Sequence, residues 1–159
     1  MDSKALFNLS LGVYVLTARK DDKDNGCIVD AVMQVTSSPN RISAVVNKQN
    51  LTHDMIKDTG LFNISVLTED TPFGVFAYFG FQSGRDIDKF KDYKAVKRAD
   101  NGILYIENIT NAYISAKVES AIDLDTHTMF IAEVTNAQIL SNEPAATYDY
   151  YLNHIKPQN

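Results

Sequence analysis

The chain has 159 residues, of which 45% are hydrophobic and 22% are charged, close to the average of folded globular proteins. This composition excludes a disordered chain, a collagen and a long coiled coil, and the length predicts a single domain over residues 1–159. The net charge is −5, and the longest basic cluster is Lys94–Arg98, which argues against a nucleic-acid-binding protein.

Cysteine and histidine are sparse in this sequence. The single cysteine, Cys27, rules out an internal disulfide, a CxxC redox pair and a cysteine-rich metal site. The three histidines, His53, His127 and His154, fall on different predicted elements, so we expect no metal site. Residues Met1–Asn8 lack the apolar core of a signal peptide, and no apolar run reaches the roughly 18–20 residues of a membrane span. We therefore expect a cytoplasmic protein.

The first part of the chain has the pattern of β-strands. Residues Gly12–Arg19 are apolar and β-branched, and the charged turn Lys20–Gly26 ends in Asn-Gly, a strong hairpin signal. Alternating residues predict one long strand over residues 27–36. A turn at Ser37–Asn40 and a strand at Arg41–Asn47 follow.

Two short helices are predicted in the middle of the chain. Asn50 can cap a helix over Leu51–Thr59, and Gly60 can end it. Pro72 opens a second, apolar helix, and a strand of alternating apolar residues lies between the two. Residues Gly80–Tyr93 form a long polar loop, and loops of this length in compact domains are usually functional or disordered.

The second half of the chain is nearly all strand. Strands are predicted at Ile103–Glu107, at 112–124 and at Met129–Leu140, with a turn at Asp123–Thr126 between the last two. A tyrosine-rich helix is predicted at Thr147–Ile155. Antiparallel strands with three short helices predict a mainly β fold, a small barrel with helical additions.

The usual catalytic signatures are absent. There is no GxSxG, HExxH, Walker or GxGxxG motif, so an enzyme with this sequence would take its chemistry from a cofactor. The most informative stretch, residues 25–56, has a Thr-Ser-Ser-Pro turn and then Asn-Lys-x-Asn-x-Thr-His at the start of a helix. A phosphate favours a helix N-terminus, where Lys48, Asn50, Thr52 and His53 could add donors. The same pattern also fits a well-capped surface helix without a ligand.

Four segments carry a family resemblance through their joint order: Gln34–Pro39, Asn47–Met55, Ser83–Phe90 and Asp125–Val134. In this order they resemble the FMN-binding split barrels of the flavin reductase-like family, and in particular the flavin domain of high-molecular-weight rubredoxins and the flavoredoxins. The sequence departs from the family pattern at three places: Asp125-Thr126 replaces Gly-Asp, Ala132 replaces a frequent Gly, and Asp30 replaces an uncharged residue, commonly Asn.

The resemblance implies an antiparallel split barrel that binds FMN at the interface of a homodimer, with NAD(P)H as co-substrate. It implies that the turn at Thr36–Ser38 donates backbone N–H groups to the flavin ring, and that His127 is the candidate catalytic residue near the flavin and the nicotinamide. Each position also has a purely structural explanation, as a turn, loop or rim residue. The residues expected to bind the cofactor are Gln34, Val35, Thr36, Ser37, Ser38, Asn47, Lys48, Asn50, Thr52, His53 and Lys89.

The resemblance also implies the reaction. We expect hydride transfer from NAD(P)H to bound FMN, followed by electron delivery to flavin or to a rubredoxin-like protein. Long rubredoxins continue into a Cys-rich iron domain where this chain ends at Asn159, so an iron centre is expected on another protein. Two alternatives stay open: an FMN electron carrier that another redox protein reduces, and a flavin-binding or dimerisation module without turnover.

Overall fold

A computed structural model describes all residues 1–159. The helical segments are η1 (Ser3–Asn8), α1 (Leu51–Thr59), α2 (Phe73–Gly80), α3 (Tyr148–Tyr150) and the π-helical η2 (Tyr151–Ile155). The strands are β1 (Tyr14–Lys20), β2 (Lys23–Val29), β3 (Val32–Ser37), β4 (Asn40–Asn47), β5 (Leu61–Leu67), β6 (Val96–Arg98), β7 (Leu104–Ile106), β8 (Thr110–Leu124) and β9 (His127–Ile139).

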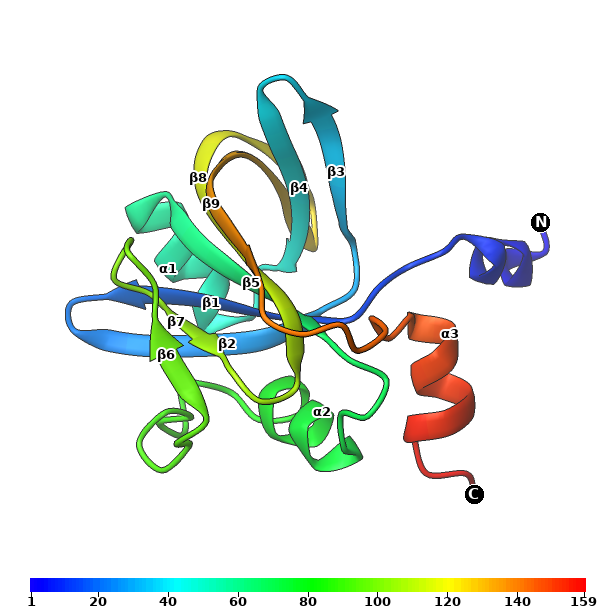
Figure 1. The fold of residues 1–159 in the computed structure, drawn as a ribbon. Coiled ribbons are helices and arrows are strands. Elements are labelled where there is room, and N and C mark those ends of the chain that lie inside the picture. The colour runs from blue at the N-terminus through cyan, green and yellow to red at the C-terminus, as the bar shows by residue number, and fades with distance from the viewer.

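Seven of the strands form one antiparallel sheet in the order β2-β1-β5-β8-β9-β4-β3, and β6 and β7 form a separate ribbon. The sheet curls strongly, but its edge strands β2 and β3 do not pair with each other, so the barrel stays open on one side (Figure 1). This is a split barrel, as the sequence predicts. None of the helices is both long and apolar enough to cross a lipid bilayer.

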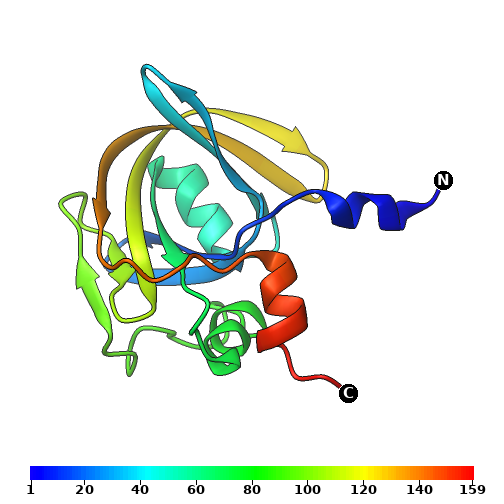
Figure 2. The same ribbon diagram turned by 45° about the vertical axis from the view of Figure 1, so that its right-hand side comes forward.

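Helix α1 lies inside the curve of the sheet (Figure 2). Its residues Met55 and Ile56 are buried in the main core, together with Phe130 of β9. A second core joins α2 to α3 and η2, which together we call the C-terminal helix. In this core the rings of Phe76 and Tyr151 lie 4.5 Å apart. Each fully buried side chain of this size contributes about 1.5–3 kcal/mol to folding.

The predicted boundaries of α1 are confirmed. Asn50 occupies the N-cap position with an extended backbone, and Gly60 follows the helix in the left-handed conformation, with φ of 72°. A glycine adopts this conformation without the steric cost that a Cβ would bring. The side chain of Asn50, however, forms no capping hydrogen bond.

The first hairpin turns earlier than the sequence predicts. Its two turn residues are Asp21 and Asp22, with φ of 49° and 61°, whereas Asn25 and Gly26 lie inside β2. The Asn-Gly turn prediction is therefore wrong. Aspartate also accepts positive φ, and the buried side chain of Asn25 is fixed in the strand by its hydrogen bond to Thr52.

The predicted long strand over residues 27–36 is also wrong, because the chain leaves one edge of the sheet and joins the other. β2 ends at Val29 and β3 begins at Val32, and the two strands lie at opposite ends of the strand order. The residues between them, Asp30 and Ala31, belong to neither strand. In the sequence, apolar residues occupy every second position through both segments without interruption. The alternation of residue types therefore contains no sign of this crossing.

The other predicted strands and helices are present in the structure, and their bounds differ little from the prediction. The short strand β6 was not predicted, because its residues Val96–Arg98 are too few to show alternation. Pro72 is the N-cap of α2 rather than its first helical residue. The polar interruption predicted at Ser120 coincides with a register shift between β8 and β9.

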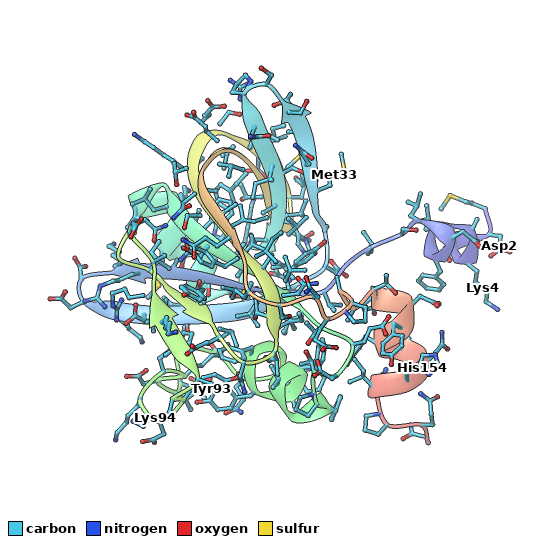
Figure 3. All side chains as sticks on the ribbon, viewed as in Figure 1. Asp2, Lys4, Met33, Tyr93, Lys94 and His154 are labelled. Carbon is cyan, nitrogen blue, oxygen red and sulfur yellow. The ribbon has the colours of Figure 1, made fainter.

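Two segments extend away from the barrel. The helix η1 contains no buried residue and lies apart from the sheet in both views (Figures 1 and 2). The hairpin of β3 and β4 projects from the barrel in a different direction (Figure 1). The side chain of Met33 on β3 points outward (Figure 3). Several large apolar side chains on these two segments are exposed: Leu6, Phe7, Leu9, Met33 and Val35.

Candidate functional site

A cavity of about 330 Å³, which we call the rim cavity, lies where β2 and β4 end near the start of α1. Three residues predicted from the sequence line it together: Asn47, Asn50 and His127. The pairing of β4 with β9 places Asn47 opposite His127, and the chain then passes from Asn47 into α1. The other lining residues are Ile28, Val29, Asp30, Ala31, Val45 and Leu124.

The N-terminus of α1 gives the rim cavity a polar end. The first N–H groups of a helix have no acceptor within the helix, and the helix dipole adds partial positive charge there. The side chain of Asn50 makes no capping bond that would use these donors. Asn47 accepts a hydrogen bond at Oδ1 from the N–H of Gln49 at 2.9 Å. This end of the cavity fits a phosphate group, and the apolar walls fit a flat aromatic ring.

His127 begins β9 and is partly buried at the edge of the rim cavity. Its Nδ1 lies 2.8 Å from the hydroxyl of Thr126. Its Nε2 has no hydrogen-bond partner within the chain, so this nitrogen is free to contact a ligand in the cavity.

Thr52 and His53 do not line the rim cavity, and their side chains form hydrogen bonds elsewhere. The hydroxyl of Thr52 is fully buried and accepts a hydrogen bond from Nδ2 of Asn25 at 2.9 Å. Nε2 of His53 lies 2.8 Å from the hydroxyl of Thr128, and Nδ1 lies 3.0 Å from a carboxylate oxygen of Asp54. These bonds fix α1 to β2 and β9, so at this position a ligand would meet the backbone of α1 rather than these two side chains.

Several side-chain contacts attach the long loop Gly80–Tyr93 to the barrel, among them the bond from Nζ of Lys23 to the carbonyl of Gly84 at 2.9 Å. Nη2 of Arg85 donates to Asp54 at 2.7 Å, and this contact, followed by that of His53, holds the pKa of the Asp54 carboxyl below its usual value. Because Asp54 is 47% exposed, solvent screens the pair and its contribution to stability is small. A further attachment is Lys89.

The structure does not bring the two predicted lysines into the rim cavity. Lys89 is 2% exposed, and its ammonium donates to the carbonyl oxygens of Gly26 at 2.8 Å and Phe79 at 2.9 Å. Burial lowers the pKa of Lys89. Lys48 lies at the surface, where its ammonium pairs with Asp123 at 2.7 Å.

The predicted residues at 34–38 lie on the projecting hairpin and are exposed. The hydroxyl of Thr36 donates to the carbonyl of Pro39 at 2.6 Å, so it stabilises the turn. Strand β4 separates this turn from the rim cavity, and its eight residues, Asn40–Asn47, span about 24 Å. Within one chain the two groups of predicted residues are therefore at opposite ends of a strand.

A second cavity, which we call the tyrosine cavity, adjoins the first and has a volume of about 260 Å³. It lies between the end of β2, helix α2 and the C-terminal helix. The two cavities share three lining residues, Ile28, Val29 and Asp30. No sequence motif directly indicated this cavity. Its signals were the aromatic residues on the two helices, Phe76, Phe81, Tyr148 and Tyr151, which the pattern assigns equally well to packing.

Comparisons with known proteins agree with this fold. The family model described as Flavin reductase like domain matches residues 6–157. The chain is 42% identical over 151 residues to the high molecular weight rubredoxin of Moorella thermoacetica, covering 95% of this chain and 66% of that protein. It is 35% identical over 153 residues to the ferric-chelate reductase (NAD(P)H) of Archaeoglobus fulgidus, covering 96% of this chain and 90% of that protein.

Solved structures show the same fold. Flavoredoxin from Methanosarcina acetivorans matches with a TM-score of 0.73 and 21% identity, over 82% of this chain and 69% of that one. An NADH:FAD oxidoreductase of Streptomyces globisporus matches with a TM-score of 0.79 and 18% identity, over 90% of this chain and 84% of that one.

The family model and the 35% identical reductase define the class of this split barrel as the flavin reductase-like oxidoreductases. The chain belongs to the flavin reductase like domain family, so the family predicted from the sequence is confirmed.

Proposed function

We propose that the protein is an FMN-dependent oxidoreductase that accepts a hydride from NAD(P)H and passes electrons to free flavin or to a rubredoxin-like protein. The observation that carries this proposal is the pair of adjoining cavities. The rim cavity has a polar end at α1 and apolar walls, and the tyrosine cavity offers a second apolar space next to it. Residues 1–159 would act as one flavin-binding unit.

In this proposal the rim cavity holds FMN. The N-terminus of α1 and the side chain of Asn50 bind the phosphate, and Ile28, Val29 and Val45 support the ring. Bound flavin supplies an acceptor for two electrons and a proton, delivered together as a hydride. Nε2 of His127, which has no hydrogen-bond partner within the chain, would contact the part of the donor that reaches from the tyrosine cavity into the rim cavity.

The tyrosine cavity holds the nicotinamide ring in this proposal. The aromatic walls exclude water and keep the ring in contact with its acceptor, so the residues contribute orientation rather than acid–base chemistry. A relative named for NAD(P)H, 35% identical, supports this donor. A relative named as a rubredoxin, 42% identical, supports a rubredoxin-like acceptor.

We also propose a homodimer in which each hairpin of β3 and β4 completes the site of its partner. The residues expected to contact the flavin ring, Thr36–Ser38, lie about 24 Å from Asn47 along β4 and could reach a rim cavity only on a second copy. The exposed apolar side chains of Met33, Val35 and Phe7 support such a contact.

Anaerobic titration of the FMN-loaded protein tests the proposed reaction. Addition of NADH, and separately of NADPH, should bleach the flavin absorbance. In His127→Ala, FMN should stay bound while reduction slows about tenfold, the effect of losing one hydrogen bond to the donor. Flavin that stays oxidised with both nucleotides but is reduced by a partner redox protein would support the electron carrier instead. Failure to bind FMN would contradict the assignment of the cavity.

A further inference from the structure

Asp30 occupies a distinctive position between the two cavities. It lies in the link between β2 and β3 and is part of the wall that both cavities share. It is the only carboxylate that lines either cavity. Its side chain is partly buried and forms neither an ion pair nor a hydrogen bond within the chain.

The apolar surroundings of Asp30 strengthen the interaction of its charge with a ligand in the cavity. Most of its neighbours in the tyrosine cavity are apolar, among them Ile28, Phe76 and Phe81. Apolar walls reduce the screening that water provides, so a charge acts more strongly across the cavity than it would at an open surface. No cationic side chain of either cavity neutralises it, since His127 is the only basic residue that lines one.

We propose that the Asp30 carboxylate selects for the nicotinamide ring of the donor, which gains a positive charge when it gives up its hydride. By stabilising that charge, Asp30 favours the departure of the hydride. This inference rests on the proposed function. In the transfer, the C4–H bond of the dihydronicotinamide breaks, and the hydride leaves with both bonding electrons for the flavin. The neutral donor ring thereby becomes a pyridinium cation, and no proton is released. A carboxylate beside the donor ring stabilises the cation more than the neutral ring, so it stabilises the transition state.

The Asp30 carboxylate also acts on the flavin, which the proposal places in the rim cavity. Electrons added to a flavin increase its negative charge, and a nearby carboxylate opposes this. Asp30 therefore lowers the midpoint potential of bound flavin while it assists the departure of the hydride. The two effects come from one charge and should disappear together in Asp30→Asn, which keeps the shape of the side chain.

Two small probes separate the charge effect from all other contacts in the cavity. Nicotinamide is neutral, and 1-methylnicotinamide presents a similar ring as a permanent cation. Their dissociation constants for the FMN-loaded protein can be measured from the perturbation of the flavin spectrum, without turnover. Asp30→Asn should reduce the preference for the cation about fivefold, which corresponds to a charge interaction of about 1 kcal/mol. High salt should reduce the preference of the natural protein in the same direction.

The matched control is Asp86→Asn, which removes a carboxylate at an exposed position of the long loop that lines neither cavity. It should leave the preference unchanged. Asp30→Ser is a second variant that removes the charge if Asp30→Asn fails to fold. Redox titration gives an independent readout, in which both variants at residue 30 should raise the midpoint potential of the bound flavin and Asp86→Asn should not.

The outcomes distinguish this inference from the proposed function. If the protein is reduced by NADH but the variants at residue 30 keep the natural preference for the cation, the inference is overturned and the proposed function stands. An unchanged or lower midpoint potential in those variants would also overturn it. If the natural protein binds no FMN, the proposed function fails, and the inference fails with it.

Discussion

Thr52 and Asn25 form a hydrogen bond that is sealed from solvent below the rim cavity. Nδ2 of Asn25 donates to the Thr52 hydroxyl, while Oδ1 of Asn25 has no partner and faces Gly84 closely. A partly satisfied buried network is sensitive to any further loss, because each unpaired group keeps its full desolvation cost. This pair therefore contributes to stability and to the placement of α1.

Thr52→Val should lower the free energy of unfolding by about 1–3 kcal/mol, because it leaves Nδ2 of Asn25 buried without an acceptor. The affinity for FMN should change by no more than about twofold, since the Thr52 side chain does not line the cavity. Urea unfolding and FMN fluorescence quenching measure the two quantities. Thr59→Val is the control, because it removes a hydroxyl from an exposed residue of the same helix, where that hydroxyl bonds the carbonyl of Met55 at 2.8 Å rather than a buried side chain. A large loss of FMN affinity at unchanged stability would show that the Thr52 hydroxyl binds the ligand.

Burial raises the pKa of the Cys27 thiol from 9.0 to about 11, so the folded state favours the protonated form. Below pH 9 both folded and unfolded chains hold this proton, and the full stabilisation is present. Between pH 9 and pH 11 the unfolded chain loses the proton first, so stability falls as the pH rises. The shift corresponds to about 3 kcal/mol.

The Cys27 contribution can be isolated by comparison with Cys27→Ala. The difference in unfolding free energy between the two proteins should be constant up to about pH 8 and should then shrink toward pH 11. Urea unfolding across this pH range is the measurement. A difference that does not depend on pH would show that the Cys27 thiol is not shielded from solvent.

Some of the candidate site could be predicted from single residues, and some could not. Asn47, Asn50 and His127 were predicted and do line one cavity. Asn50 follows from the local signal of a helix start, whereas the predicted roles of Asn47 and His127 came from the family resemblance. Thr52 and Lys89 have the right chemistry but are buried, and a pattern of residue types does not show how deeply a polar group lies. Burial depends on packing between distant elements.

At the scale of elements, side-chain hydrogen bonds rather than strand or helix pairing hold the long loop, and those of the buried Lys89 ammonium link it to two elements. Lys89 links the carbonyl of Phe79 in α2 to the carbonyl of Gly26 in β2. Charged donors make stronger hydrogen bonds than neutral ones. These two bonds join β2 to α2, two of the three elements that surround the tyrosine cavity. The loop therefore also fixes α2 at the site.

Lys89→Met should destabilise the protein by about 1–3 kcal/mol, because two buried carbonyls lose their donor. The loop Gly80–Tyr93 should become sensitive to limited proteolysis before the rest of the chain. Lys91→Met, at an exposed position two residues away, should change stability by less than about 0.5 kcal/mol. Equal protease resistance of both variants would contradict the role given to Lys89.

The elements themselves differ in how far sequence predicts them. The bounds of α1 follow from a cap residue and a glycine that are adjacent to the helix, so local signals suffice. The change of sheet edge at Asp30 and Ala31 depends on which strands pair, and pairing is not encoded in the alternation of one segment. The open barrel came from the family resemblance rather than from periodicity.

At the scale of the whole molecule, the open side of the barrel and the projecting hairpin leave apolar surface exposed. A cavity of about 390 Å³ opens between the hairpin and the rest of the sheet, with Val32, Ile42 and Ile114 among its walls. β3 is an edge strand, and exposed edges of this kind promote association unless a partner covers them. The proposed homodimer provides that cover and brings each hairpin to a second copy.

The double variant Met33→Lys/Val35→Lys tests whether the hairpin holds the dimer and completes the site. Met33 is 63% exposed and Val35 37%, so the substitutions should leave the circular dichroism spectrum of the fold nearly unchanged. Two lysines placed against a second copy would bury charge, so the variant should sediment as a monomer. FMN affinity should fall by about tenfold or more, because each site would lose the contacts of the partner hairpin. Thr59→Lys, an exposed position on α1, should leave assembly intact. A monomeric variant that binds FMN with full affinity would show that the site is complete within one chain.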